Sequence, residues 1–372
     1  MNRRGISLGR ILGIPIELDY SWFLVFALVA WTLAAGYFPA QFKNWPVAQY
    51  WIVGIVTAVL FFVSVLLHEL GHSVVARRYK IPVSGIKLFI FGGVSQIGSE
   101  PPSAGVEFVM AVVGPMVSFG LAGVFALLAR GLASSAPVVA LTRYLAYINL
   151  VLGAFNLIPG FPLDGGRVLR SIAWGATHSM ERATFIAGTV GRIIGFLFIL
   201  VGVWQVIAGN FINGLWIGFI GWFLEGAAGS QMQQQRIQGL LAGHKVSEAM
   251  SRDYTTVKPD LTLQQLVDDH ILNTGQRSFV VQENGHVDGL LTLHDIKGVP
   301  RNTWSSTRAR QIMVDAADLK RTGPDAELWD AIEEMERDGV NQLPVMIDGQ
   351  MVGMLRRDDV LSYLRTVREL GR

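Results

Sequence analysis

Residues 51–72 read WIVGIVTAVLFFVSVLLHELGH, and this stretch decides how the first part of the chain folds. Residues 51–67 are almost wholly apolar and uncharged, and the run is long enough to cross a bilayer as a helix. His68 and His72 follow at a spacing of four, so both imidazoles lie on one face of that helix and can reach a single metal ion. Glu69 stands beside the first histidine, where its carboxylate can accept a proton from water activated at the metal.

The position of this motif in an apolar helix bears on its interpretation. A bare H-E-x-x-H pattern also arises by chance on ordinary helices. In hydrocarbon, however, two imidazoles and a carboxylate are costly to retain unless a metal compensates them. The membrane setting therefore favours a metal site over a chance match.

The composition indicates a membrane protein with a polar C-terminal part. The chain has 372 residues, of which 51% are hydrophobic and only 16% are charged. It contains no cysteine, so disulfides are excluded and protein ligands to a metal must be His, Asp or Glu. The net charge of +2, without a basic run, gives no indication of a nucleic-acid partner. No small-residue cleavage site follows the first apolar run, which we interpret as a signal anchor.

Hydropathy predicts six membrane-spanning helices. They are Tyr20–Tyr37, Trp51–Ala76, Val106–Leu128, Val138–Ile158, Ala183–Ala208 and Phe211–Leu224. Basic residues concentrate in the segments that face inward if the N-terminus is cytoplasmic, so the positive-inside rule predicts a multi-pass cell-membrane protein with both termini in the cytoplasm. Arg192 falls inside the fifth span, and we expect its side chain to snorkel to the cytoplasmic interface.

Asp164 is the predicted third metal ligand. It lies in NLIPGFPLDGG, residues 156–166, where Pro159 and Pro162 remove backbone donors and must break the fourth span. A broken helix places this carboxylate at the cytoplasmic depth expected for His68. The alternative is that Asp164 only caps the helix that starts at Gly165. Because the carboxylate and the histidine motif share one depth, we favour ligation.

The two motifs together resemble the site-2 protease family of intramembrane zinc metalloproteases. His68–His72 is similar to the family's H-E-x-x-H motif, residues 156–166 to its N-x-x-P-x-x-P-x-D-G motif, and residues 13–16 to the segment before its first helix. Asp19-Tyr20 departs from the histidine that many members have at that place. The resemblance covers roughly residues 8–228.

The resemblance assigns roles to five residues. It implies one zinc ion held by His68, His72 and Asp164, with Glu69 as general base. It gives Asn156 the role of holding the substrate carbonyl or oxyanion, although this amide could equally satisfy backbone groups of the broken helix. The implied activity is hydrolysis of peptide bonds in transmembrane segments of membrane-anchored proteins, as in regulated intramembrane proteolysis.

A β-hairpin is expected between the second and third spans. Residues 81–91 and 94–97 are rich in strand-forming residues and flank Gly92-Gly93, which we take as the turn. A free strand edge could hold an unwound substrate by strand addition. The alternative, equally weighted, is a hairpin that only packs over the helical bundle.

The C-terminal part contains an internal repeat. Residues 246–250 recur as 309–313 and residues 289–295 as 353–359, and each copy alternates strand-like and helical runs. The copies resemble a tandem pair of CBS domains, modules that commonly bind adenine nucleotides. The resemblance implies a nucleotide site at Thr292 and Asp295 in the first copy. In the second copy, Asp359 keeps the carboxylate while Arg356 replaces the hydroxyl. The alternative is a pair that serves as a homodimerisation platform without a ligand.

The predicted fold is thus a six-helix membrane bundle with a small β-hairpin, followed by a cytoplasmic α/β tandem. The predicted boundaries are a protease domain at residues 1–228, a linker or helical extension at 229–245, and CBS domains at 246–300 and 309–368. The alternative function is a CBS-gated metal transporter or channel. The six spans show no repeat of the kind typical of transporters, and Glu69 has a chemical role only in hydrolysis, so the sequence favours the protease.

Overall fold

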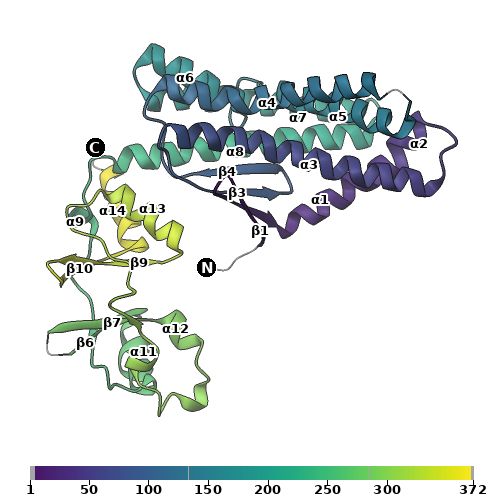
Figure 1. Cartoon of the computed structure of the whole chain (residues 1–372). Coiled ribbons are helices and arrows are strands. Elements are labelled where there is room, and N and C mark those ends of the chain that lie inside the picture. The colour runs from purple at the N-terminus through teal and green to yellow at the C-terminus, as the bar shows by residue number, and fades with distance from the viewer. Residues whose placement is uncertain (1–4, 133, 284, 370–372) are drawn as a thin grey trace. The chain divides into compact units, whose positions relative to one another are not determined.

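The computed structural model describes residues 5–132, 134–283 and 285–369. These residues fall into two compact units, one that ends at Gln235 and one that begins at Arg236. The boundary lies inside a continuous helix, α8, which runs from Phe211 to Leu241 (Figure 1). Of the two expectations for residues 229–245, the structure therefore has the helical extension over most of their length.

The N-terminal unit contains the six membrane helices that hydropathy predicts. Within the described residues, the segments long and apolar enough to span a membrane are Tyr20–Gln41 (α1 Tyr20–Trp31, η1 Thr32–Tyr37 and α2 Phe38–Gln41), α3 Val47–Arg78, α4 Ala104–Gly131, α5 Ala136–Asn156, α7 Met180–Ile207 and α8. Helix α8 differs most from its predicted span, because it continues past Leu224 through a polar segment to Leu241.

The fourth span breaks where the prolines predict. Helix α5 ends at Asn156, residues 157–163 are not helical, and α6 then runs from Asp164 to Thr177. The chain can turn back tightly because Gly166 has no side chain: a Cβ there would lie 2.3 Å from the carbonyl carbon of Gly160. The break therefore delivers Asp164 to the first position of a new helix that packs against α4.

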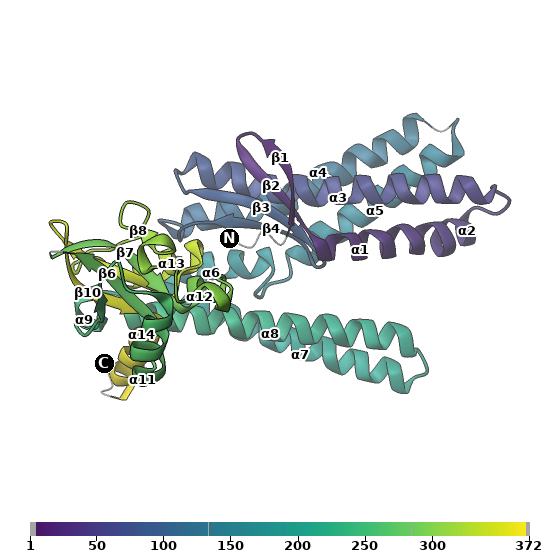
Figure 2. The same ribbon diagram turned by 90° about the horizontal axis from the view of Figure 1, so that it is seen from below.

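The predicted hairpin is part of a larger sheet. Its strands β3 (Val83–Phe89) and β4 (Gly92–Ile97) join β1 (Gly5–Ile11) and β2 (Ile14–Asp19) in the order β1-β2-β3-β4. Strand β3 runs parallel to β2 and antiparallel to β4, so β4 is an edge strand and β3 is not (Figure 2). Strands β1 and β2 were not predicted from the sequence.

The hairpin turn lies two residues earlier than predicted. Phe89 pairs with Gly92, so Ile90 and Phe91 form the turn and Gly92-Gly93 begins strand β4. Gly92 has a φ of 120°, a conformation that favours glycine and lets the strand start directly after a two-residue turn. The ring of Phe91 stacks on Phe223 of α8 at a centroid distance of 4.2 Å.

Two polar residues at the membrane helices have partners that the sequence did not indicate. Asp19 caps α1 through the Ser21 backbone and pairs with Lys87 on β3 at 2.7 Å. The hydrogen bond from Lys87 holds the pKa of Asp19 well below its usual range. Arg192, which we expect to snorkel to the interface, donates from its Nε to Glu225 Oε1 on α8 at 2.7 Å.

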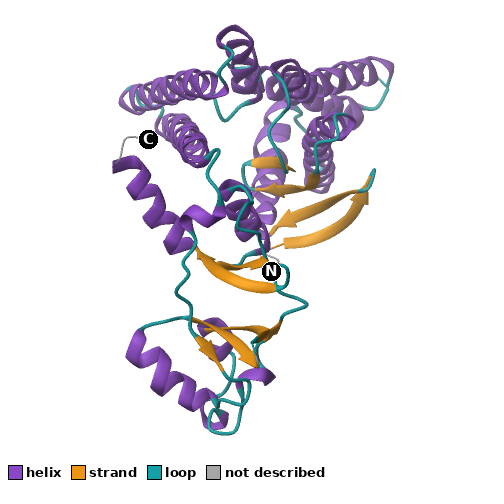
Figure 3. Ribbon diagram, turned by 90° about the vertical axis from the view of Figure 1, so that its left-hand side faces the viewer, coloured by secondary structure: helices purple, strands orange, loops and turns teal. Residues whose placement is uncertain are grey.

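The C-terminal unit consists of two similar α/β halves (Figure 3). The first half contains α9 Val246–Ala249, β5 Thr256–Val257, α10 Leu263–Gln265, η2 Leu266–Ile271, α11 Leu272–Thr274, β6 Ser278–Glu283, β7 His286–Thr292, α12 Leu293–Lys297 and η3 Arg301–Thr303. The second half contains η4 Ala309–Gln311, β8 Val314–Asp315, α13 Leu328–Asp338, β9 Gln342–Ile347, β10 Gln350–Arg356 and α14 Arg357–Glu369.

The halves exchange their first segments. Strand β8 lies near the start of the second half but pairs with β7 of the first half. Ser251, near the start of the first half, forms a β-bridge with Met354 on β10 of the second half. Gly289 and Gly353 occupy the matching positions at these crossings. A Cβ on Gly289 would lie 2.4 Å from the Val314 carbonyl oxygen, and one on Gly353 would lie 3.0 Å from that of Ser251.

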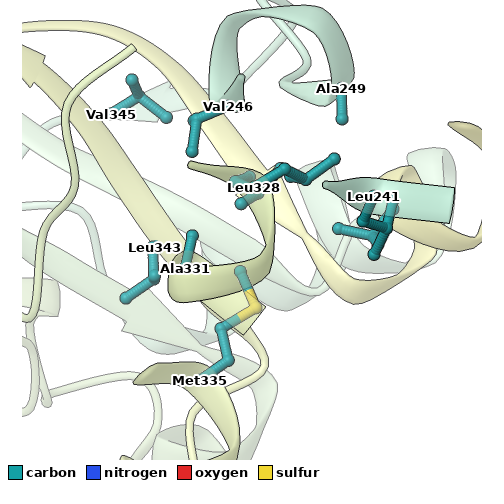
Figure 4. Packing of buried hydrophobic residues seen from close by; sticks show 10 residues of the cluster. Leu241, Val246, Ala249, Leu328, Ala331, Met335, Leu343 and Val345 are labelled. Carbon is teal, nitrogen blue, oxygen red and sulfur yellow. The ribbon is translucent and has the colours of Figure 1, made fainter. Parts of the chain in front are cut away.

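The exchange is also visible in the cores. Val246 and Ala249 of α9 pack in the core of the second half with Leu328 and Leu343 (Figure 4). Leu241, the last residue of α8, is fully buried in the same core. Neither half therefore has a complete hydrophobic core without the first segment of the other.

Candidate metal centre

His68 and His72 are held by hydrogen bonds from their outer ring nitrogens to α4. Both residues are only 4% exposed. His72 Nδ1 donates to the Met110 carbonyl oxygen at 2.6 Å, and His68 Nδ1 lies 2.9 Å from Ser118 Oγ. A carbonyl only accepts, so the proton of neutral His72 resides on Nδ1 and its Nε2 is free to bind a metal. Two contacts to one helix thus aim both Nε2 atoms at the same point.

Asp164 completes the set of donor atoms. Its Oδ2 lies 3.0 Å from His68 Nε2 and 3.2 Å from His72 Nε2. Helix α6 begins at Asp164 with Leu163 as its N-cap, so this carboxylate turns to the histidines and does not cap the helix. Asp164 therefore lies next to His68 and His72, as predicted, although it is 96 and 92 positions away from them in the chain.

The donor set fits a zinc ion. The three ligand atoms lie within 4.8 Å of one another, in a region where both histidines are buried. Bonds of about 2.0–2.2 Å in a tetrahedral site separate neighbouring donors by roughly 3.3–3.6 Å, slightly more than the two nitrogen–oxygen distances observed. Two imidazoles and one carboxylate leave the fourth position for water or substrate, which is the arrangement of a catalytic zinc site.

Gly114 provides the space for the metal. This residue lies on α4 next to Pro115, and a Cβ on it would lie 2.2 Å from His72 Nε2 and 2.7 Å from His68 Nε2. Both distances are too short for a carbon atom, and the shorter one is close to the length of a zinc–nitrogen bond, about 2.0–2.1 Å. The missing side chain thus leaves open the place that a metal would take.

Glu69 lies beside the donor set and faces strand β4. Its Oε2 accepts a hydrogen bond from Ser95 Oγ at 2.8 Å. A Cβ on Gly93 would lie 2.5 Å from Glu69 Cγ, so a side chain at that position would displace the carboxylate. The carboxylate is therefore enclosed between α3 and β4 next to the histidines.

Asn156 ends α5 and is half buried. In the part of the chain that the structure describes, its amide forms no hydrogen bond to Glu69 or to the three metal ligands. The structure thus places Asn156 at the break between α5 and α6, next to the segment that carries Asp164.

A buried ion-pair cluster that the sequence analysis missed supports α6. Arg170 is 3% exposed and pairs with Glu107 on α4, which is fully buried, and with Glu100 in the loop after β4. Its guanidinium also lies over the Phe161 ring at 5.4 Å. The cluster ties the helix that begins with Asp164 to the helix that orients both histidines. No local pattern pairs residues so far apart in the chain, so nothing in the sequence could have indicated it.

A second candidate site lies in the C-terminal unit. A cleft of about 1180 Å³ is lined by both halves, and Thr292, Asp295 and Arg356 line it. Thr292 Oγ1 donates to Asp295 Oδ2 at 2.7 Å, so the two residues cap α12 together. Asp359 accepts from the Arg356 backbone at 3.0 Å and does not itself line the cleft, and burial raises the pKa of its carboxyl group.

Comparison with known proteins gives matches over the whole chain. The model for "Peptidase family M50" matches residues 56–134 and 121–202, and the model for "CBS domain" matches residues 246–301 and 309–366. "Putative zinc metalloprotease Rip3" of Mycobacterium tuberculosis is 31% identical over 371 residues, which cover 98% of this chain and 94% of the relative. "Zinc metalloprotease MJ0392" of Methanocaldococcus jannaschii is 27% identical over 362 residues, 96% of each chain.

Among solved structures, the "Site-2 Protease from Methanocaldococcus jannaschii" is 30% identical. The match covers 61% of this chain and 95% of that chain, with a TM-score of 0.44.

Proposed function

Because the chain belongs to the M50 family of site-2 intramembrane zinc metalloproteases, we propose that it hydrolyses peptide bonds within transmembrane segments of membrane-anchored proteins. The observation that carries this proposal is the convergence of His68 Nε2, His72 Nε2 and Asp164 Oδ2 beside the Glu69 carboxylate, with both histidines on a helix that is long and apolar enough to span a membrane. An ionisable cluster of this kind is costly to place in a membrane, which favours a functional role for it.

Each polar group of the site has a part in this reaction. His68, His72 and Asp164 would hold the zinc ion, which supplies a Lewis acid toward the scissile carbonyl and the attacking water. Glu69 accepts the proton of that water and passes it to the departing amide nitrogen. Asn156, at the break between α5 and α6, is proposed to hold the substrate carbonyl once a substrate is bound. The burial of both histidines keeps bulk water away from these charges.

Strand β4 is the proposed docking edge for the substrate. A helical substrate hides its carbonyl groups in internal hydrogen bonds and must be extended before hydrolysis. Strand β3 already pairs on both sides, whereas β4 pairs on one side only and lies against Glu69. An extended substrate that adds to β4 would thus lie next to the proposed base.

The substitution Glu69→Gln tests the chemical step. The amide keeps the shape of the side chain but cannot accept the proton, so turnover should fall by roughly a hundred- to ten-thousandfold while zinc stays bound. His68→Ala, His72→Ala and Asp164→Ala should lower the zinc content as well as activity. Metal analysis and cleavage of a transmembrane substrate by the purified variants distinguish the two classes. Appreciable proteolysis by Glu69→Gln would contradict the assigned mechanism.

We further propose that both termini are cytoplasmic and that the C-terminal pair regulates the protease by binding an adenine nucleotide. In this proposal the protease domain comprises residues 1–228, residues 229–245 connect it to the pair, and the CBS domains span residues 246–300 and 309–368. Five basic residues line the cleft and could bind phosphate groups: Arg277, Lys297, Lys320, Arg356 and Arg357.

The substitution Asp295→Ala tests the nucleotide site. Loss of a charged acceptor for the ribose should weaken binding by roughly ten- to a hundredfold. Because Asp295 also caps α12, Asp295→Asn serves as the comparison that keeps part of the cap, and Asp330→Ala, at an exposed position of α13, is a control outside the cleft. Calorimetry of the full-length protein with adenosine, AMP, ADP and ATP, beside cleavage assays, measures binding and its effect. Binding without a change in cleavage would remove the regulatory role.

A further inference from the structure

One face of strand β4 is directed at Glu69. Gly93 and Ser95 are two residues apart, so they lie on the same face of the strand. Gly93 leaves the space that Glu69 Cγ occupies, and Ser95 places its hydroxyl against the Glu69 carboxylate. The strand therefore combines a position without a side chain and a hydrogen-bond donor at the spacing that this carboxylate requires.

The hydroxyl of Ser95 has partners that fix its direction. Its Oγ lies 2.8 Å from Glu69 Oε2 and 3.0 Å from the Glu69 carbonyl oxygen. Ser73, one helical turn after Glu69 and fully buried, donates its own hydroxyl proton to Ser95 Oγ at 3.1 Å. Because the oxygen of Ser95 accepts from Ser73, its single proton is directed to Glu69.

We infer that Ser95 is a positioning residue for the general base. By donating to Oε2, Ser95 holds the carboxylate in one orientation and leaves Oε1 to accept the proton of the attacking water. A flexible glutamate would otherwise have to be ordered at each turnover, and a fixed orientation removes that cost from the barrier. The same strand offers the free edge proposed for substrate docking, so one element places the peptide and the base relative to each other.

This inference rests on the proposed role of Glu69, and its test separates the two. Ser95→Ala removes the hydroxyl and little else. It should lower kcat by roughly ten- to a hundredfold, the value of a hydrogen bond to a charged group, with KM changed less than about threefold. Zinc content should stay at the native level because, among the described residues, the hydroxyl of Ser95 hydrogen bonds to Ser73 and Glu69 and to none of the three proposed metal ligands.

Two further variants isolate the hydroxyl. Ser95→Thr keeps the donor on a residue that strands favour, and it should recover most of kcat. Ser84→Ala makes the same chemical change at an exposed position of β3 and should leave kcat and KM unchanged. Kinetics on a transmembrane substrate, metal analysis and thermal unfolding are measured for all variants alongside Glu69→Gln.

The outcomes show whether the Ser95 hydroxyl positions Glu69. A native kcat in Ser95→Ala, equal losses in Ser95→Ala and Ser95→Thr, or a loss of zinc would each overturn the positioning role. The expected pattern is a kcat defect that threonine repairs, with native zinc content and a native unfolding midpoint. If Glu69→Gln remains active, the proposed base itself is wrong, and that result is independent of the Ser95 series.

Discussion

The substitution Gly114→Ala should remove zinc from the protein without removing a ligand. The added Cβ would lie 2.2 Å from His72 Nε2 and 2.7 Å from His68 Nε2. Unbonded carbon and nitrogen atoms approach to about 3.5 Å, so the methyl group would overlap the His72 ring by about 1.3 Å. It would also occupy the place between the two nitrogen atoms where we expect the metal to bind.

The histidines have little freedom to move away from this methyl group. Both rings are hydrogen bonded through Nδ1 to α4, the same helix that carries Gly114. Relieving the overlap therefore requires breaking those bonds or shifting α3 from α4, at a cost of about 1–3 kcal/mol in the free energy of unfolding. We expect the zinc content to fall from about one equivalent to almost none, and proteolysis to fall with it.

The same helix provides matched controls. A Cβ on Gly120 or Gly123 of α4 has no neighbouring atom within 4 Å. Alanine at those positions should leave zinc and activity unchanged and should favour the helix by up to about 1 kcal/mol. The assay is metal analysis of the purified proteins after exposure to excess zinc, with cleavage and thermal unfolding measured on the same samples. Native zinc content in Gly114→Ala, or equal losses in Gly114→Ala and Gly120→Ala, would refute the reasoning.

Two other predictions follow from charged groups. Arg170→Ala leaves the carboxylate of Glu107 buried without its partner, which should lower the free energy of unfolding by about 3–5 kcal/mol. The double substitution Arg170→Met with Glu107→Leu should recover most of that stability, because it removes both charges. Unfolding of the detergent-solubilised proteins measures both effects. In the C-terminal unit, a hydrogen bond with His244, with further bonds from the Lys245 backbone and Tyr363, lowers the pKa of Glu248 from 4.5 to about 2. The stabilisation from a lowered carboxyl pKa is fully present above pH 4.5 and is lost as the pH falls toward 2. Glu248→Gln should therefore flatten the acid dependence of hydrogen exchange in this unit. An unchanged acid profile would contradict the role given to Glu248.

Local sequence patterns predicted the elements and the chemistry of the donor atoms. Six apolar runs became six membrane helices, because a bilayer requires about 20 apolar residues in a helix and composition alone reveals this. The spacing of His68 and His72 sets both rings on one helix face wherever that helix lies. Pro159 and Pro162 ended α5 where their missing backbone donors required it.

The sequence predicted the exact position of the hairpin turn incorrectly and missed two strands. The turn of the β3–β4 hairpin was placed at Gly92-Gly93, but the structure uses Ile90 and Phe91 because Gly92 pairs with Phe89 as the first strand residue. A glycine indicates a bend, but it does not determine whether the glycine itself lies in the turn or in the strand beside it. Strands β1 and β2 were also missed: β1 pairs with β2 in a local hairpin, and β2 pairs with β3, far along the chain.

Contacts between distant residues were decided by the tertiary structure alone. The sequence named Asp164 as a ligand, but only the packing of α6 against α4 brings its Oδ2 to both histidines. Ser95 and Gly114 have no recognisable motif, yet one contacts the proposed base and the other leaves space for the metal. A periodic pattern specifies which face of an element is buried, whereas the partner across that face depends on how all elements pack together.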